Sequence, residues 1–177
     1  CATQQINHNR FRGYKMDKIK RYLPHILALY CSAIFLSSLP FKFSNAPETQ
    51  TIFGKLNDWA ATFGAEGLFA QTGLFSQYVI GTAELLAAAA LLIGILPRFR
   101  RLQGFGALLG FAVMSGAISF HLFTPLGIDP NNDGGLLFVM ACGVWVSSAI
   151  ILIFRKDYVL QGIKKIGCAL FGEPISE

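Results

Sequence analysis

An ionisable side chain inside an apolar stretch is the first feature of this sequence that could do chemistry. Glu84 lies in the apolar run 78–96, about 9 Å along a helix that begins at Tyr78. A carboxylate inside a membrane-spanning helix is expensive and usually faces neighbouring helices. Gly81 and Ala88 share its helix face, and small residues let helices approach closely. Glu84 is therefore either a functional group in the protein interior or a structural carboxylate bonded to another helix.

A histidine near the end of the apolar run 102–123 is the second such feature. His121 shares a helix face with Gly106 and Gly110, so we expect it to point toward other helices. An imidazole titrates near physiological pH and could exchange protons with a ligand. The alternative is an interfacial histidine that only packs and hydrogen-bonds. His25 is predicted at the opposite membrane boundary, ~30 Å away, so the two cannot hold one haem, and no closely spaced metal ligands are visible.

Two further charged residues are predicted at the same end of the helices as Glu84 and His121. Lys42 directly follows the first apolar run, and Asp133 directly precedes the last. Four groups that converge in this way would make a polar pocket under an apolar rim. The alternatives are a lysine whose ammonium extends along the helix to the membrane surface and a carboxylate that caps the fourth helix.

Four apolar runs have to position these side chains. They cover residues 22–39, 78–96, 102–123 and 135–154, and each is close to the ~20 residues that a helix needs to cross hydrocarbon. Only 14% of the 177 residues are charged, against roughly 25% in soluble domains. The sequence therefore predicts an all-α membrane protein in which four transmembrane helices form a bundle. A polar N-terminal segment (1–21) precedes this membrane domain (22–156), and a cytoplasmic amphipathic tail (157–177) follows it.

The basic residues predict the orientation. They gather in segments 10–21, 98–101 and 155–165, whereas the other two connections hold only Lys42 and Lys55. Cytoplasmic connections are enriched in Lys and Arg, so both termini should lie in the cytoplasm. The net charge of +5 belongs to these flanking clusters, and no basic stripe with interleaved aromatic residues suggests a nucleic-acid partner.

The connection between the first two runs is predicted to form an amphipathic helix. Ile52, Leu56, Trp59 and Phe63 recur at helical spacing, and charged residues occupy the other side. Such a helix would lie in the outer membrane interface. A shorter helix of the same kind is expected within the tail.

Prolines and charges predict the ends of the spans. Pro40 is expected to end the first span, Pro125 the third, and Arg155 the fourth. The beginning of the chain allows two interpretations, because Met16 would make a natural start and Cys1 could be the lipidated residue of a lipoprotein. None of the four cysteines forms a CxxC pair, so a disulfide framework is not expected.

Five segments together give a family resemblance. Residues 42–56 read KFSNAPETQTIFGKL, 81–92 read GTAELLAAAALL, 97–101 read PRFRR, 119–128 read SFHLFTPLGI and 133–138 read DGGLLF. In their order and spacing they resemble the DoxX-like family of small four-helix bacterial membrane proteins. The resemblance implies a four-helix bundle in the bacterial cytoplasmic membrane. It also points to a set of polar ligand-binding positions, which are Lys42, Glu84, Arg98, Arg101, His121 and Asp133.

Some members of that family are subunits of a thiosulfate:quinone oxidoreductase, and others are linked to membrane redox partners. The resemblance therefore implies a subunit of a redox or respiratory system that binds a quinone-like or lipid molecule near Glu84 and His121, with no intrinsic cofactor. The sequence has no CxxC, no haem ligand pair and no nucleotide motif, so a self-sufficient enzyme is not expected. The alternative is a non-catalytic structural or assembly subunit of a larger membrane complex.

Overall fold

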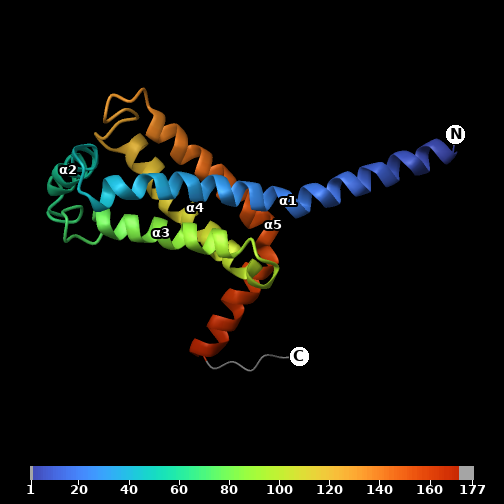
Figure 1. The fold of residues 1–177 in the computed structure, drawn as a ribbon. Helices are drawn as coiled ribbons and strands as arrows, with labels where there is room; N and C mark the ends of the chain where they lie inside the picture. The colour runs from blue at the N-terminus through green and yellow to red at the C-terminus, as the bar shows by residue number, and fades with distance from the viewer. Residues whose placement is uncertain (1, 172–177) are drawn as a thin grey trace.

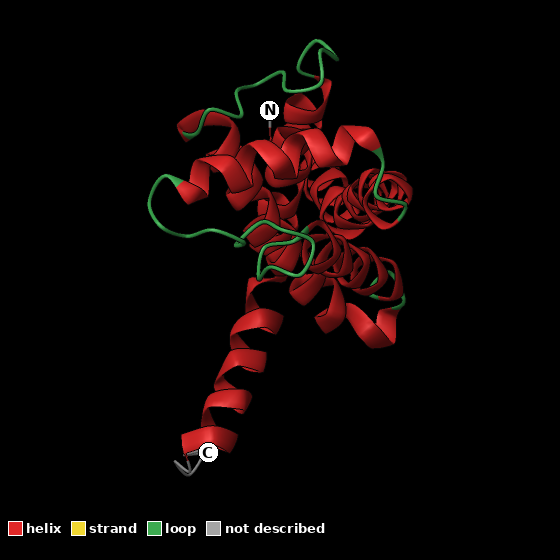
Figure 2. Cartoon of the chain, turned by 90° about the vertical axis from the view of Figure 1, so that its left-hand side faces the viewer, coloured by secondary structure: helices red, strands yellow, loops and turns green. Residues whose placement is uncertain are grey.

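The computed structural model describes residues 2–171, and over this range the chain consists of helices and loops without a strand (Figure 2). The elements in chain order are α1 (Ala2–Phe43), α2 (Pro47–Ala61), α3 (Gln77–Ile93), the short 3₁₀ helix η1 (Pro97–Phe99), α4 (Arg100–Phe123) and α5 (Leu136–Phe171). The N-terminal part of α1 and the C-terminal part of α5 project beyond the other helices (Figure 1). The predicted all-α class is confirmed.

Three helical segments are long and apolar enough to cross a membrane. They are Ile19–Phe43 in α1, Pro97–Phe123 in η1 and α4, and Leu136–Lys165 in α5. The fourth apolar helix, α3, has 17 residues, or about 25 Å at 1.5 Å per residue. That is slightly less than the ~30 Å hydrocarbon core. The three long helices indicate a membrane-embedded protein.

The helices pack through a core of small and medium side chains. α3 contacts α1 and α4, while α5 contacts α4 and α1. The buried core residues come from all four helices: Ala28, Cys31, Phe35, Ala87, Ala88, Leu91, Ala107, Met114, Ala141, Val144 and Ile151. Many large apolar residues on the outside, such as Leu86 and Ile153, are exposed, which suits surfaces that face lipid tails.

Two glycines on α4 allow close helix contacts, as their spacing predicted. A Cβ added at Gly106 would lie 2.8 Å from the backbone nitrogen of Leu91 and 2.9 Å from the carbonyl oxygen of Ala87. A Cβ at Gly110 would lie 3.1 Å from the Phe35 ring. The prediction that both glycines face other helices is confirmed.

The amphipathic helix predicted between the first two runs is α2, and it lies at one end of the long helices (Figure 1). Its Leu56 and Ala60 are buried with Phe69 and Leu126 in a second apolar cluster. The Phe120 ring of α4 meets the Phe69 ring edge-on, with centroids 5.2 Å apart. The end of α4 is therefore attached to α2 and to the loop that follows α2.

Two predicted helix ends are wrong. α1 continues past Pro40 to Phe43, because a proline lacks its own N–H but keeps its carbonyl, and Pro40 O accepts a bond from Ser44 N at 2.9 Å. α5 continues past Arg155 to Phe171, because charge alone does not break a helix. The tail is thus a continuation of α5, and most of the polar N-terminal segment belongs to α1. The predicted end at Pro125 is confirmed, since α4 ends at Phe123.

Replacing Gly106 with Ala tests the close packing of α3 and α4. The new methyl group would meet backbone atoms, and overpacking of this kind costs about 1–3 kcal/mol. The control is Gly116→Ala on the same helix, because a Cβ there meets nothing within 4 Å. We expect the melting temperature in detergent to fall for Gly106→Ala and to stay constant or rise for Gly116→Ala. Equal melting temperatures for the two variants would contradict the packing.

Candidate functional site

Four of the predicted site residues belong to one end of the long helices, here called the α2 end. It comprises the end of α1, α2, the start of α3, the end of α4 and the start of α5 (Figure 1). Lys42 is in the last turn of α1, His121 is in the last turn of α4, and Asp133 precedes α5. Glu84 is in the first half of α3. Contacts among these elements then decide which of the four side chains meet.

Glu84 and Lys42 form an ion pair between α3 and α1. The Lys42 Nζ lies 2.8 Å from Glu84 Oε2. The Ser38 hydroxyl donates to the same oxygen at 2.7 Å, and Lys42 Nζ lies 3.1 Å from Ser38 Oγ. Only 5% of the Glu84 side chain and 16% of the Lys42 side chain are exposed. A carboxylate buried among apolar helices is stabilised by such a pairing, which supplies both a countercharge and a hydrogen bond.

The backbone around Lys42 is fixed by neighbouring polar groups. The Gln77 amide donates to Lys42 O and to Asn45 Oδ1, both at 2.9 Å. Gly81 lies beside the lysine, where a Cβ would be in van der Waals contact, 3.4 Å from Lys42 Cδ. The sequence analysis did not identify Ser38 or Gln77. Ser38 could have been found, since it lies one turn before Lys42 on the same face of the helix.

His121 is held by the loop after α4. Its Nδ1 lies 2.6 Å from Gly127 O. A carbonyl oxygen only accepts, so Nδ1 carries the proton, and in the neutral ring Nε2 is left as an acceptor. The ring packs edge-on against Phe138 of α5, with centroids 5.6 Å apart. His121 is buried, as its small-residue face predicted.

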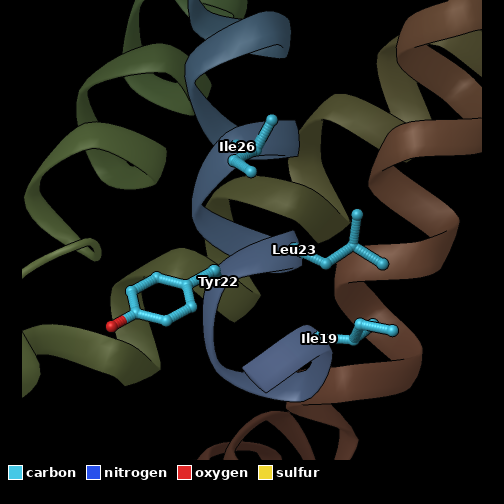
Figure 3. Close-up of a pocket in the computed structure, with 4 residues that line it drawn as sticks. All are labelled: Ile19, Tyr22, Leu23 and Ile26. Carbon is cyan, nitrogen blue, oxygen red and sulfur yellow. The ribbon is translucent and has the colours of Figure 1, made fainter. Parts of the chain in front are cut away.

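Glu84 and His121 have separate partners. Among the described residues no hydrogen bond joins them, and the pocket predicted to contain both stays a prediction. One cavity of about 280 Å³ is a shallow apolar groove on α1, lined by Ile19, Tyr22, Leu23 and Ile26 (Figure 3). A second of about 260 Å³ lies at the opposite end of the long helices and is basic. In the described part of the chain, no cluster of three His, Cys, Asp or Glu side chains could hold a metal ion.

Asp133 caps α5, which is the alternative role that its position suggested. Its carboxylate accepts from Gly135 N at 3.0 Å and from Leu137 N at 3.2 Å. Desolvation raises the pKa of Asp133. The hydrogen bonds, first of all the one from Leu137 N, lower the pKa by more than desolvation raises it, so the net shift is downward. This exposed carboxylate therefore stabilises the loop and the first turn of α5.

Arg98 and Arg101 lie away from the other predicted site residues. Both are exposed and stand where η1 leads into α4. Because α3 runs from the α2 end to η1, these arginines lie at the opposite end, here called the η1 end (Figure 1). The predicted ligand-binding set is therefore divided between two ends of the molecule.

A second polar cluster, not predicted from the sequence, lies at the η1 end. Gln103 is fully buried, and its Nε2 lies 3.2 Å from His25 Nδ1 and 3.4 Å from Pro24 O. Its Oε1 accepts from Arg155 Nε at 2.9 Å. The amide thus joins α1, α4 and α5. A lone glutamine near the start of an apolar run gave no signal that it would be buried.

No family model, no curated protein and no solved structure matches the chain. The DoxX-like resemblance therefore rests on the five sequence segments.

Removing one partner of the Lys42–Glu84 pair tests its contribution to stability. Lys42→Met leaves a buried carboxylate without its countercharge, which costs about 3–5 kcal/mol in fully buried pairs. Because Lys42 is partly exposed, we expect about 2–3 kcal/mol, measured by unfolding in detergent. The control is Lys156→Met at an exposed position of α5, which should change stability little. A loss no larger than that of the control would show that the pair is not important for the fold.

Acid titration tests the Asp133 cap. Its pKa is lower in the folded than in the unfolded chain, where it is about 3.9. The stabilisation is therefore complete above about pH 4 and is lost as the pH falls through the folded value. We expect Asp133→Asn to be less stable than the wild type at neutral pH, with a difference that narrows in acid. The matched control is Asp58→Asn, on the exposed side of α2. A stability difference between the wild type and Asp133→Asn that stays constant down to pH 2 would contradict the role of the Asp133 carboxylate as a cap.

Proposed function

We propose that the chain is a four-span integral membrane protein of the bacterial cytoplasmic membrane with both termini in the cytoplasm. α3 serves as the fourth span and completes a helical bundle. Two observations support this arrangement: α3 packs against both α1 and α4, and its apolar sequence continues beyond Ile93 through Leu96. The distribution of Lys and Arg supports the orientation.

We further propose that the protein is a DoxX-like subunit associated with a redox or respiratory system. Its α2 end would bind a lipophilic molecule with a polar headgroup, such as a quinone. The observation that carries this proposal is the ion pair of Lys42 and Glu84 among apolar helices, 2.8 Å apart. Ionisable groups at such depth are rare and usually serve a function.

The chemistry of this end suits a quinone headgroup. A quinone carbonyl accepts hydrogen bonds, and the Lys42 ammonium is a donor, whereas Nε2 of the neutral His121 ring is an acceptor for the hydroxyl of a reduced headgroup. Glu84 Oε2 already accepts from Lys42 and Ser38, whereas among the described residues no donor reaches Oε1. That oxygen is left for a ligand hydroxyl. The electrons for any reduction of the headgroup would come from a redox partner protein.

The second candidate is a structural or assembly subunit of a larger membrane complex. It is favoured by the same pair of residues, because Lys42 and Ser38 compensate Glu84 within the chain. A carboxylate compensated in this way can act simply as a clamp between α1 and α3. The two candidates differ in what a change at Glu84 should affect.

Binding of a short-chain ubiquinone analogue to the protein in lipid nanodiscs separates the two candidates. We expect saturable binding to the wild type and at least tenfold weaker binding to Glu84→Gln, which loses the carboxylate charge. The matched control is Glu48→Gln, at an exposed position of the first turn of α2, which should bind like the wild type. If the wild type shows no saturable binding and Glu84→Gln changes only thermal stability, the structural candidate is correct.

A further inference from the structure

A basic cavity at the η1 end is lined by four cationic side chains. Lys20 and Arg21 come from α1, Arg100 from α4 and Arg155 from α5, around a volume of about 260 Å³. Among the side chains that the structure describes, the single salt bridge is the Lys42–Glu84 pair at the other end. No described carboxylate therefore compensates these four charges.

Two of the four arginine and lysine side chains are partly withdrawn from solvent. Arg155 is 7% exposed, and its Nε is fixed by the buried Gln103. The Nε of Arg100 is buried and has no hydrogen-bond partner among the described residues. A buried cationic donor without a protein partner is unfavourable unless water or a bound anion accepts its hydrogen.

Two neighbouring arginines show that a role in setting the membrane topology does not by itself explain where Arg100 lies. Arg98 and Arg101 are also at the η1 end, and both are exposed, as expected for charges that only set the topology. Arg100 lies between them in sequence yet turns toward α1 and α5. Arg100 and Arg155 thus form a less exposed side of the cavity, and the exposed Lys20 and Arg21 form its outer side.

We propose that this cavity is a binding site for a phosphate group. Guanidinium groups present several donors in a planar fork that matches phosphate oxygens. One phosphate monoanion or dianion would compensate part of the charge and could accept the unused Arg100 Nε–H.

The position of the cavity favours an anionic phospholipid as the molecule that supplies this phosphate group. Lys20 and Arg21 are at the start of the apolar segment that begins at Ile19, and Arg100 is at the start of the one that begins at Pro97. Segment starts of this kind lie where hydrocarbon meets headgroups, and basic pockets between membrane helices bind anionic headgroups at that level. The site does not depend on the proposed quinone function, because it lies at the other end of the helices.

Lipid titration of the detergent-solubilised protein, followed by native mass spectrometry, tests the site. We expect saturable binding of phosphatidylglycerol in preference to phosphatidylcholine. Arg100→Gln should weaken that binding at least tenfold. Arg21→Gln should also weaken it and does not risk the fold, because Arg21 is exposed. The matched control is Arg101→Gln, next in sequence but outside the cavity, which should bind like the wild type.

Inorganic phosphate distinguishes the two sources of the ligand. Weak competition by phosphate, at matched ionic strength with chloride, identifies the site as a phospholipid site. If phosphate displaces the lipid with an affinity at least as high as that of phosphatidylglycerol, the phosphate site is supported and the free anion is its ligand. Equal lipid binding by Arg100→Gln, Arg21→Gln and Arg101→Gln, or no preference for phosphatidylglycerol, would overturn the proposal.

Discussion

The ion pair between Lys42 and Glu84 is the interaction on which the arrangement of the α2 end depends. A carboxylate among apolar helices needs a countercharge within reach, and Lys42 supplies it at 2.8 Å only because α1 continues past Pro40. That continuation brings the end of α1 beside the start of α3, where Gln77 bonds to the Lys42 carbonyl. At this end, the contact of α1 with α3 and the polar character therefore both involve Lys42.

The two ends of the molecule satisfy their charges differently. At the α2 end, charges are compensated within the chain: Lys42 pairs with Glu84, and Asp133 binds the backbone of α5. At the η1 end, four cations line one cavity without a described carboxylate, and one of them, Arg155, bonds to Gln103. Between the ends, small residues such as Gly106 and Ala88 let the helices approach closely. The α2 end thus supplies its own countercharges, whereas the cavity at the η1 end is where we propose that a phosphate group binds.

The sequence predicted those features of the fold that depend on residues close together in the chain. Hydrophobic runs predicted the helices, small-residue faces predicted that Glu84 and His121 are buried, and the position of Asp133 suggested a cap. Prediction failed where tertiary contacts decide. Pro40 and Arg155 do not end their helices, since each helix end is set by its surroundings. The contact of Gln103 with Arg155 joins residues far apart in the chain, and the sequence pattern of a single helix carries no information about it.

Infrared spectroscopy of the protein in lipid tests most directly whether Glu84 is an ionised partner of Lys42. Subtracting the spectrum of Glu84→Gln from that of the wild type isolates the carboxyl group of Glu84. We expect carboxylate stretching bands at neutral pH in the wild type, and a shift of their frequencies in Lys42→Met, because that variant lacks the ammonium that donates to Glu84 Oε2. A protonated carboxyl band already present in the wild type, and unchanged in Lys42→Met, would contradict the central role of the ion pair.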